Sequence, residues 1–423
     1  MTPRVEQMRI GKADPFYGML DGFCFASKNL YNQALYRVRQ NYCIGRGYLN
    51  YNSIDASFKT DGREQNTPAI NGMNNADYRN MPTAASAQQT LILHHRNWIS
   101  FFTATKEYKK HPDNFTGKPR MPGYLDKIQG RQVVALPGQS LSLNGGYIKF
   151  PATFKGFTVK FRHNATVLQV RFVPSNSFIT VEVVYHVDEE DPKADNGRYF
   201  GIDLGINNFA TIASNVMPPL IINGAPLKSI NQHYNKLTAH YRSIETQLRP
   251  QVSRTGATYC KQTNRLLKLT TKRNTRVKDA MHKISRYIVD LAVANDITKI
   301  IVGKNVGWKQ EVNLGRRTNQ NFVQLPHTQF VDMLTYKARA KGIKVITKEE
   351  SYTSKTSHLD MEQPKKQKQY KGTREHRGLF RTANGTKVNA DVNGAAQIMR
   401  KAIPTIAAYG LSGGENPVKV DAA

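Results

Sequence analysis

Apolar residues change their spacing along the chain, and each spacing predicts a different kind of element. Residues 20–42 and 86–108 repeat apolar side chains at intervals of three and four, which predicts two long helices. Residues 157–163, 168–172 and 178–187 instead alternate apolar and polar side chains. That alternation, with Gly and Asn turn signals between the runs, predicts short strands in a small antiparallel barrel.

The rest of the chain alternates strand patterns with helix patterns. Strands are expected at 200–214, 299–303 and 343–350, and helices at 228–296 (broken near 249–257), 321–342 and 393–403. Strands that alternate with helices predict parallel strands joined by right-handed crossovers, and hence an α/β layer.

Two turn-rich segments separate these regions. Residues 111–123 are rich in Pro, Gly and Asn, and residues 187–197 are acidic in an otherwise basic chain. A length of 423 residues suggests two or three domains. We therefore expect a multidomain protein.

The charge balance identifies a class of partner. The chain has 61 Lys and Arg against 31 Asp and Glu, a formal net charge of +30. A chain this basic is typical of proteins that bind a polyanion, and nucleic acid is the usual one. A merely basic solvated surface accounts for a few charges but not for thirty.

Other features exclude whole classes of protein. No run reaches the roughly 18 apolar residues of a membrane helix, so no membrane partner is expected. The first 18 residues lack the apolar core of a secretory signal. Cys24, Cys43 and Cys260 are too far apart for a CxxC zinc site. We expect a reduced, cytoplasmic protein.

Two aspartates stand where chemistry could be carried out. Asp203 lies inside an apolar strand start, a costly position unless the acid is paired or binds a metal, although it could also cap the turn that Asn207 and Asn208 predict. Asp391 stands at a helix entry before small residues that allow close backbone approach, and by pattern alone it is an N-cap.

Taken in order, the motifs resemble a known family. Four of them are similar to the RuvC-like nuclease domain of TnpB proteins, which are transposon-encoded and related to compact type V CRISPR effectors and Fanzor: GIDLGINNFAT, IIVGKN, EESYTSK and NADVNGAAQI. Upstream, SAQQTLILHHRNWISFFTATKEY and GKPRMPGY resemble the family's helical recognition domain running into its wedge barrel.

The resemblance implies a domain layout. It places a helical recognition domain at 16–115, a wedge-like β-barrel at 1–15 and 116–196, and a RuvC-like domain of RNase H fold at 197–423. It also implies guide RNA and target double-stranded DNA as partners, and DNA cleavage with Mg²⁺ or Mn²⁺. The oligomeric state stays open, with a monomer favoured.

The resemblance also implies three metal-binding acids. Asp203 and Asp391 match two of them, and hard oxygen ligands are what such cations require. The third acid of most relatives falls at Gly303, but some members carry a displaced glutamate in the stretch that here reads KEESYTSK.

Geometry allows this displacement. If 299–303 and 343–350 are neighbouring parallel strands, a carboxylate at 349 or 350 lies at the same sheet edge as Gly303. Neighbouring strand residues point to opposite faces, so only one of Glu349 and Glu350 is the ligand, and the resemblance favours Glu350. Glu311 is a further candidate, and the two glutamates could also be plain surface charges.

A second departure concerns zinc. Relatives often insert a zinc ribbon here, but Ser357 stands where its first cysteine falls and no cysteine follows Cys260. We expect no zinc, and a basic insert at about 352–388 that either covers nucleic acid or is disordered when unbound. Its predicted nucleic-acid-binding residues are Lys365, Lys366, Arg374 and Arg377.

The helical stretch 261–286 is also dense in basic residues. Such density suits phosphate tracking along a heteroduplex without reading sequence, although a solvated basic face is an alternative. His282 is interpreted as structural, since a Mg²⁺ site needs no imidazole. The predicted contacts are Lys261, Arg265, Lys268, Lys272, Arg273, Arg276, Lys283 and Arg286.

Three functions therefore compete. The first is an RNA-guided DNA endonuclease that uses Asp203, Glu350 and Asp391. The second is a nuclease-inactive RNA-guided repressor, and the third is an RNase H-fold transposase.

Overall fold

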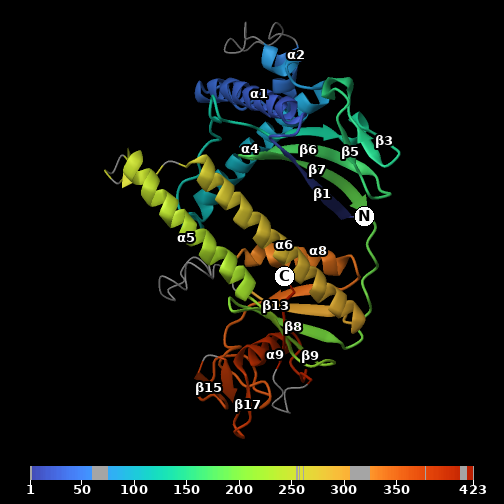
Figure 1. Ribbon diagram of the computed structural model, residues 1–423, viewed down its shortest axis with the longest axis vertical. Coiled ribbons are helices and arrows are strands. Elements are labelled where there is room, and N and C mark those ends of the chain that lie inside the picture. Colours follow the sequence, from blue (N-terminus) through green and yellow to red (C-terminus); the bar gives the residue numbers. More distant parts are fainter. Residues whose placement is uncertain are drawn as a thin grey trace. The chain divides into compact units, whose positions relative to one another are not determined.

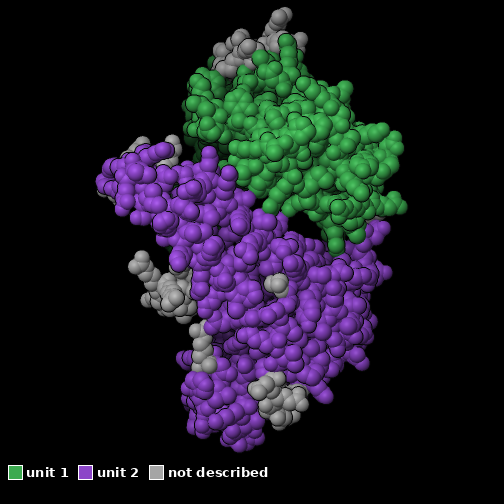
Figure 2. All heavy atoms as spheres, in the orientation of Figure 1, with its two compact units in different colours: residues 1–187 green, residues 188–423 purple. Residues whose placement is uncertain are grey.

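The chain forms two compact units, residues 1–187 and 188–423 (Figure 2). Each is described by itself below. The computed structural model describes residues 2–59, 75–253, 256, 258–260, 262–304, 324–376, 378–409 and 417–422.

The helices of the first unit pack around a core of their own. The two long helices α1 (Tyr17–Cys43) and α4 (Ala84–Lys110) lie where the apolar spacing predicts them, and α4 begins at a capping box. The fully buried Trp98 fills the space between them. The shorter helices are α2 (Tyr51–Lys59), α3 (Ala76–Arg79) and the 3₁₀ turn η1 (Pro112–Asn114).

Two antiparallel sheets share the second core of this unit. One has the order β1-β7-β6-β2 and the other β3-β4-β5. Their inner faces meet around Phe154, Phe157 and Phe172, and the start of α1 packs there as well. The strands are β1 (Thr2–Gly11), β2 (Val134–Pro137), β3 (Ser142–Asn144), β4 (Tyr147–Lys149), β5 (Thr158–Lys160), β6 (Val167–Pro174) and β7 (Phe178–Val187), with 3₁₀ turns η2 (Gly138–Ser140) and η3 (Ala152–Phe154).

A six-stranded sheet forms the centre of the second unit. Its order is β14-β13-β8-β9-β10-β18, and β8, β13 and β14 run parallel as the strand–helix alternation predicts. The carboxyl ends of these three strands therefore meet at one edge. The strands are β8 (Tyr199–Leu204), β9 (Asn208–Ser214), β10 (Leu220–Asn223), β13 (Lys299–Gly303), β14 (Lys344–Lys348) and β18 (Val418–Val420).

Helices cover both faces of this sheet (Figure 1). α6 (Asn264–Ala294) and α8 (His327–Arg339) pack in one core with Phe200, Ile202 and Val302. α9 (Ala390–Ala402) packs against the opposite face, where Ile301 contacts Ile398 and Met399.

The expected long helical block is two helices. α5 (Ala225–Leu248) and α6 are joined through a two-stranded ribbon, β11 (Gln251–Val252) and β12 (Thr258–Tyr259), at the predicted break. No helix among the described residues combines the length and the apolar character needed to cross a bilayer.

The basic insert contains a small antiparallel sheet. β15 (Thr373–His376), β16 (Leu379–Arg381) and β17 (Lys387–Asn389) pair in sequence order, and β17 leads directly into α9. Phe380, Val388 and Ala390 form its core. The alternative of a wholly disordered loop is therefore wrong for the described part of this insert.

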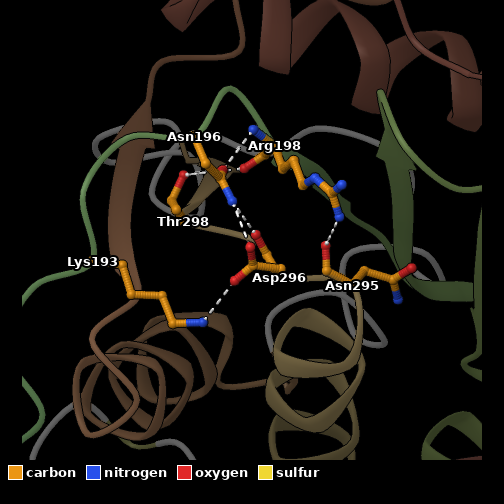
Figure 3. A network of polar contacts seen from close by, with 6 residues as sticks. All are labelled: Lys193, Asn196, Arg198, Asn295, Asp296 and Thr298. Carbon is orange, nitrogen blue, oxygen red and sulfur yellow. Dashed lines mark hydrogen bonds and ion pairs between the residues drawn. The ribbon is translucent and has the colours of Figure 1, made fainter.

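The acidic segment before β8 is attached to the second unit (Figure 3). Lys193 Nζ lies 3.1 Å from Asp296 Oδ1, and Asn196 donates to the Asp296 carbonyl and carboxylate at 2.8 and 2.9 Å. Thr298 donates to Asn196, and Arg198 donates to the carbonyl of Asn295. The segment is thus held by the turn between α6 and β13.

Candidate functional site

Strand β8 places Asp203 on the face that α9 covers. Phe200, Ile202 and Leu204 point into the core with α6 and α8, so the alternation of a strand puts Gly201 and Asp203 on the other face. A Cβ at Gly201 would lie 2.3 Å from the carbonyl oxygen of Ala395. Helix and strand backbones thus approach closely at this point.

A second glycine makes room for the carboxylate. A Cβ at Gly394 would lie 2.8 Å from Asp203 Oδ2, closer than real Cβ contacts allow. The sequence-based expectation that small residues let α9 approach another backbone is confirmed. Asp203 therefore lies directly on the first turns of α9.

Asp391 is in the first turn of α9 but does not cap it. The N-cap is Asn389, whose side chain accepts from the amides of Asp391 and Val392. The N-cap interpretation of Asp391 is therefore wrong, because the residue two positions earlier does that work. Its Oδ2 instead accepts a 2.8 Å bond from Asn208, and its Oδ1 lies 3.7 Å from Arg374 Nη2.

Glu350 occupies the space that Gly303 leaves open. Gly303 pairs with Lys348 across the two parallel strands, and Glu350 follows two residues after β14 ends. A Cβ at Gly303 would lie 2.6 Å from Glu350 Oε1 and 2.7 Å from its Cγ. Glu350, the predicted displaced acid, thus lies directly against Gly303.

Glu349 points elsewhere. Its carboxylate accepts from the Ser351 amide at 3.0 Å and from Lys401 Nζ at 2.9 Å, and its side chain is 57% exposed. The hydrogen bonds from Ser351 and Lys401 hold its pKa below the usual range. Of the two neighbouring glutamates only Glu350 faces Gly303. Glu311 lies outside the described residues.

The carboxyl groups of Asp203 and Glu350 lie in surroundings that disfavour their charged forms. Burial raises the pKa of Asp203 well above its usual range, the charges of Glu350 and Asp391 raise it further, and Arg374 opposes them. Burial also raises the pKa of Glu350 to about 7, with the Glu349 charge adding to the rise. Carboxylates perturbed in this way are typical of functional sites.

A polar cavity of about 430 Å³ opens in front of two of these acids. Asp203 and Asp391 line it, and Glu350 is not among its lining residues. The other lining residues come from β8, β9, the turn between them and the β15–β16 hairpin. They are Leu204, Gly205, Ile206, Asn207, Asn208, Thr211, Arg374 and Gly378.

The donor set fits a hard divalent cation. All three acids offer carboxylate oxygens, the ligands that Mg²⁺ and Mn²⁺ prefer. In the described part of the chain, however, no three His, Cys, Asp or Glu side chains are gathered closely enough to hold a metal ion. Asn208 and Arg374 engage the two oxygens of Asp391, so a cation would have to share this carboxylate with them or replace one of them.

The basic residues predicted on α6 fall into three groups. Lys283 and Arg286 form ion pairs with Asp279 and Asp290, one turn away in each case. Arg273 is half-buried and donates to Asn231 and to the carbonyl of Gln324, so burial lowers its pKa and it ties α5 and α6 to the segment before α8. The third group is exposed and has no carboxylate partner among the described residues: Arg265, Lys268, Lys272 and Arg276.

The remaining predicted contacts lie in the insert or outside the described residues. Lys365 and Lys366 are exposed, and Arg374 lines the cavity while its side chain stays partly exposed. Lys261 and Arg377 are outside the described residues. His282 lies beside Lys337, which donates to its carbonyl, and burial lowers the pKa of its imidazole.

Hydrogen bonds surround Ser357, near the start of the insert. The buried Glu362 carboxylate accepts from the amides of Ser357 at 2.8 Å and Lys371 at 3.3 Å. Arg400, also buried, donates to the carbonyls of His358 and Ile406. Glu362 thus closes a loop within the insert, and Arg400 joins the start of the insert to α9.

Sequence reasoning missed two residues of the site. Asn208 was noted only as part of a turn, and its bond to Asp391 spans 183 positions. Arg374 was assigned to general nucleic-acid contact, not to the acids. Neither placement has a local sequence signal.

Comparisons with known proteins agree with these observations. Residues 182–309 match the family model OrfB_IS605, described as a probable transposase, and residues 327–398 match the TNB domain of Cas12f1-like proteins. Both matches agree with the resemblance to TnpB proteins and compact type V effectors that the sequence motifs indicate. Among curated proteins no significant match was found.

Solved structures similar to this chain include three type V effectors. The mini-RNA-guided endonuclease CRISPR-Cas_phi3 is 10% identical over 95% of this chain and 92% of its own, with a TM-score of 0.51. CasPhi-2 (Cas12j) bound to crRNA and phosphorothioate DNA is 9% identical over 96% and 92%, with a TM-score of 0.47. The Cas12f1–sgRNA–target DNA complex is 14% identical over 94% and 99%, with a TM-score of 0.33.

The first of these similarities concerns the fold. It shows that this chain shares the mixed α/β, multidomain fold of that effector. The expected multidomain α/β class is confirmed.

Proposed function

We propose that this chain is an RNA-guided DNA endonuclease that hydrolyses phosphodiester bonds at a RuvC-like site. The observation that carries the proposal is Glu350, whose carboxyl group lies against Gly303 on the α9 face of the sheet that also holds Asp203. A chain that had lost its third acid would have no need of a buried, costly carboxyl group at this position.

The three acids would hold the divalent cations. Asp203 lies at the centre, since its carboxyl is affected by the charges of both Glu350 and Asp391. Bound Mg²⁺ or Mn²⁺ supplies activation of water and stabilisation of the leaving oxygen in the manner of two-metal nucleases. Asn208 orients Asp391 through its 2.8 Å bond, as outer partners of metal ligands do.

The rest of the chain supplies nucleic-acid binding under this proposal. Residues 16–115 act as the recognition domain, 1–15 and 116–196 as the wedge, and 197–423 as the nuclease domain. The exposed arginines and lysines of α6 suit the backbone of a guide RNA–target DNA duplex, which a protein holds by shape and charge. The net charge of +30 agrees with partners that are both polyanions.

One observation favours a second function. Gly303 provides no carboxylate at the strand end, and without Glu350 as a ligand the chain would bind guided DNA without cutting it. A third candidate, strand transfer, follows only from the description of the matching family model as a probable transposase.

The deciding experiment begins with the RNA that co-purifies with the chain. Its sequence defines a complementary double-stranded DNA target, which is offered with randomised flanks in Mg²⁺ or Mn²⁺. We expect cleavage by the unmodified chain and none by Asp203→Asn. Guided binding without cleavage in either metal would support the repressor, joining of cut ends to other DNA would support the transposase, and a chain that binds no RNA would refute guidance.

A further inference from the structure

Arg374 is a basic side chain inside an acidic site. It belongs to β15 in the insert, and it is the one Lys or Arg among the described residues that line the cavity of Asp203 and Asp391. Its Nη2 atom lies 3.7 Å from Asp391 Oδ1, and its charge counters the two other acids at Asp203.

The insert positions this arginine through its attachment to α9. The amide of Ala390 donates to the carbonyl of Gly378 at 3.0 Å, so the β15–β16 hairpin lies over the start of the helix. Phe380 and Val388 pack with Ala390 beneath it. Because Asp391 is the next residue, the hairpin and the acid are held together.

The ion pair between Arg374 and Asp391 is weak enough for another anion to replace it. Both side chains keep solvent exposure, 40% for Arg374 and 33% for Asp391, and a 3.7 Å separation is long for an ion pair. Exposed pairs of this kind are weak. A phosphate offers arginine a stronger, bidentate partner than a single distant carboxylate oxygen.

We infer that Arg374 is a displaceable counter-ion of Asp391 that the DNA phosphate removes. While no DNA is bound, the guanidinium neutralises part of the charge of Asp391 in the cavity that Asp203 also lines, and lowers the affinity of the site for a divalent cation. When the strand to be cut enters the cavity, its phosphate binds Arg374, and the Asp391 carboxylate is freed to bind the cation.

The inference rests on the proposed function and goes beyond it. It makes metal binding and DNA binding positively coupled through one side chain, and such coupling is reciprocal. A cation would then bind weakly until substrate DNA is present, which restricts hydrolysis to engaged DNA.

The test measures Mn²⁺ binding to the full chain by the loss of the free-ion electron paramagnetic resonance signal. We expect Arg374→Gln, without DNA, to bind Mn²⁺ about tenfold more tightly than the unmodified chain, in the usual range of coupling factors. A short, non-hydrolysable single-stranded DNA should tighten Mn²⁺ binding more in the unmodified chain than in Arg374→Gln. Arg374→Lys keeps the charge and should restore weak binding.

Arg381→Gln is the matched control. Arg381 lies on the next strand of the same small sheet and pairs with Glu375, which keeps Lys387 as a partner at 3.9 Å when the arginine is removed. Arg381→Gln should leave the Mn²⁺ affinity of the chain unchanged. Equal Mn²⁺ affinity in Arg374→Gln and the unmodified chain, with cleavage intact, would overturn the inference alone, whereas absence of Mn²⁺ binding in every variant would overturn the nuclease proposal with it.

Discussion

Replacing Gly303 by Ala should destabilise the sheet only while Glu350 is present. The new Cβ would lie 2.6 Å from Glu350 Oε1, 2.7 Å from its Cγ and 2.6 Å from Ile398 Cδ1. Gly303 does not have a positive φ, so the cost is steric and not conformational. Overpacking of this kind costs about 1–3 kcal/mol in the free energy of unfolding.

Making Gly303→Ala in the Glu350→Ala variant isolates the share of this steric cost that is due to Glu350. In Glu350→Ala the two overlapping Glu350 atoms are absent, and only the flexible end of Ile398 remains to move. The cost of Gly303→Ala should then fall below about 1 kcal/mol, a coupling of about 1–2 kcal/mol between the two sites. Glu350→Gln keeps the volume and removes the charge, so Gly303→Ala should cost as much there as in the unmodified chain.

Native-state hydrogen exchange read by mass spectrometry measures these differences locally. The reporting amides are those of β13 and β14 and of Lys304, which donates to the Lys348 carbonyl at 2.8 Å. An equal loss of protection from Gly303→Ala in the Glu350→Ala and unmodified backgrounds would refute the close packing of the two positions. A loss that vanishes in Glu350→Gln would show that charge, not volume, causes it.

Other predictions concern the acids and the insert. Asp203→Ala and Glu350→Ala should each abolish guided DNA cleavage while leaving target binding nearly intact in a gel-shift assay, and Glu349→Ala should keep most cleavage because its carboxylate is engaged by Lys401 outside the site. Folding raises the pKa of Glu350 from 4.5 to about 7, so the metal-free protein loses stability as the pH rises from 4.5 to 7. Glu350→Gln cannot ionise and should therefore be more stable than the unmodified chain at pH 8, by up to about 3 kcal/mol, and equally stable near pH 4. Urea unfolding at the two pH values measures this difference. Glu362→Ala should destabilise the insert by about 1–3 kcal/mol, because the hydrogen bonds that its carboxylate accepts from the amides of Ser357 and Lys371 are lost. Faster amide hydrogen exchange in the insert measures this loss. Elemental analysis should find no stoichiometric zinc.

The fold was predictable for those helices and strands that bury one face and expose the other. The long helices α1 and α4 and the strands β6 and β7 bury regular apolar positions, so their period is visible in the sequence. Strand β1 was missed because the side chains it turns inward include Arg4 and Glu6, while Val5 is 44% exposed. Its pattern is set by pairing along the whole of β7 and not by hydrophobicity.

The site was predictable in its acids but not in their neighbours. Asp203 stands out because an acid in an apolar strand start is costly, and the parallel arrangement of β13 and β14 explains why a glutamate just after β14 can fill the space at Gly303. The bond from Asn208 to Asp391 and the approach of Arg374 depend on how the insert folds over α9. A core as small as Phe380, Val388 and Ala390 leaves no periodic signal from which that folding could be read.

The attachment of the acidic segment has a mechanical consequence. Tension applied to the chain at Asp188 reaches the Lys193–Asp296 and Asn196–Asp296 contacts before it reaches β8. Asp195 adds a further attachment through Lys299, the first residue of β13. Glu189 and Glu190 pair still earlier with Arg339 at the end of α8 and with Lys341 just after it, so the load is shared among several attachments and β8 is not pulled from the sheet alone. Asp203, at the far end of β8, is shielded from strain that enters through the preceding residues.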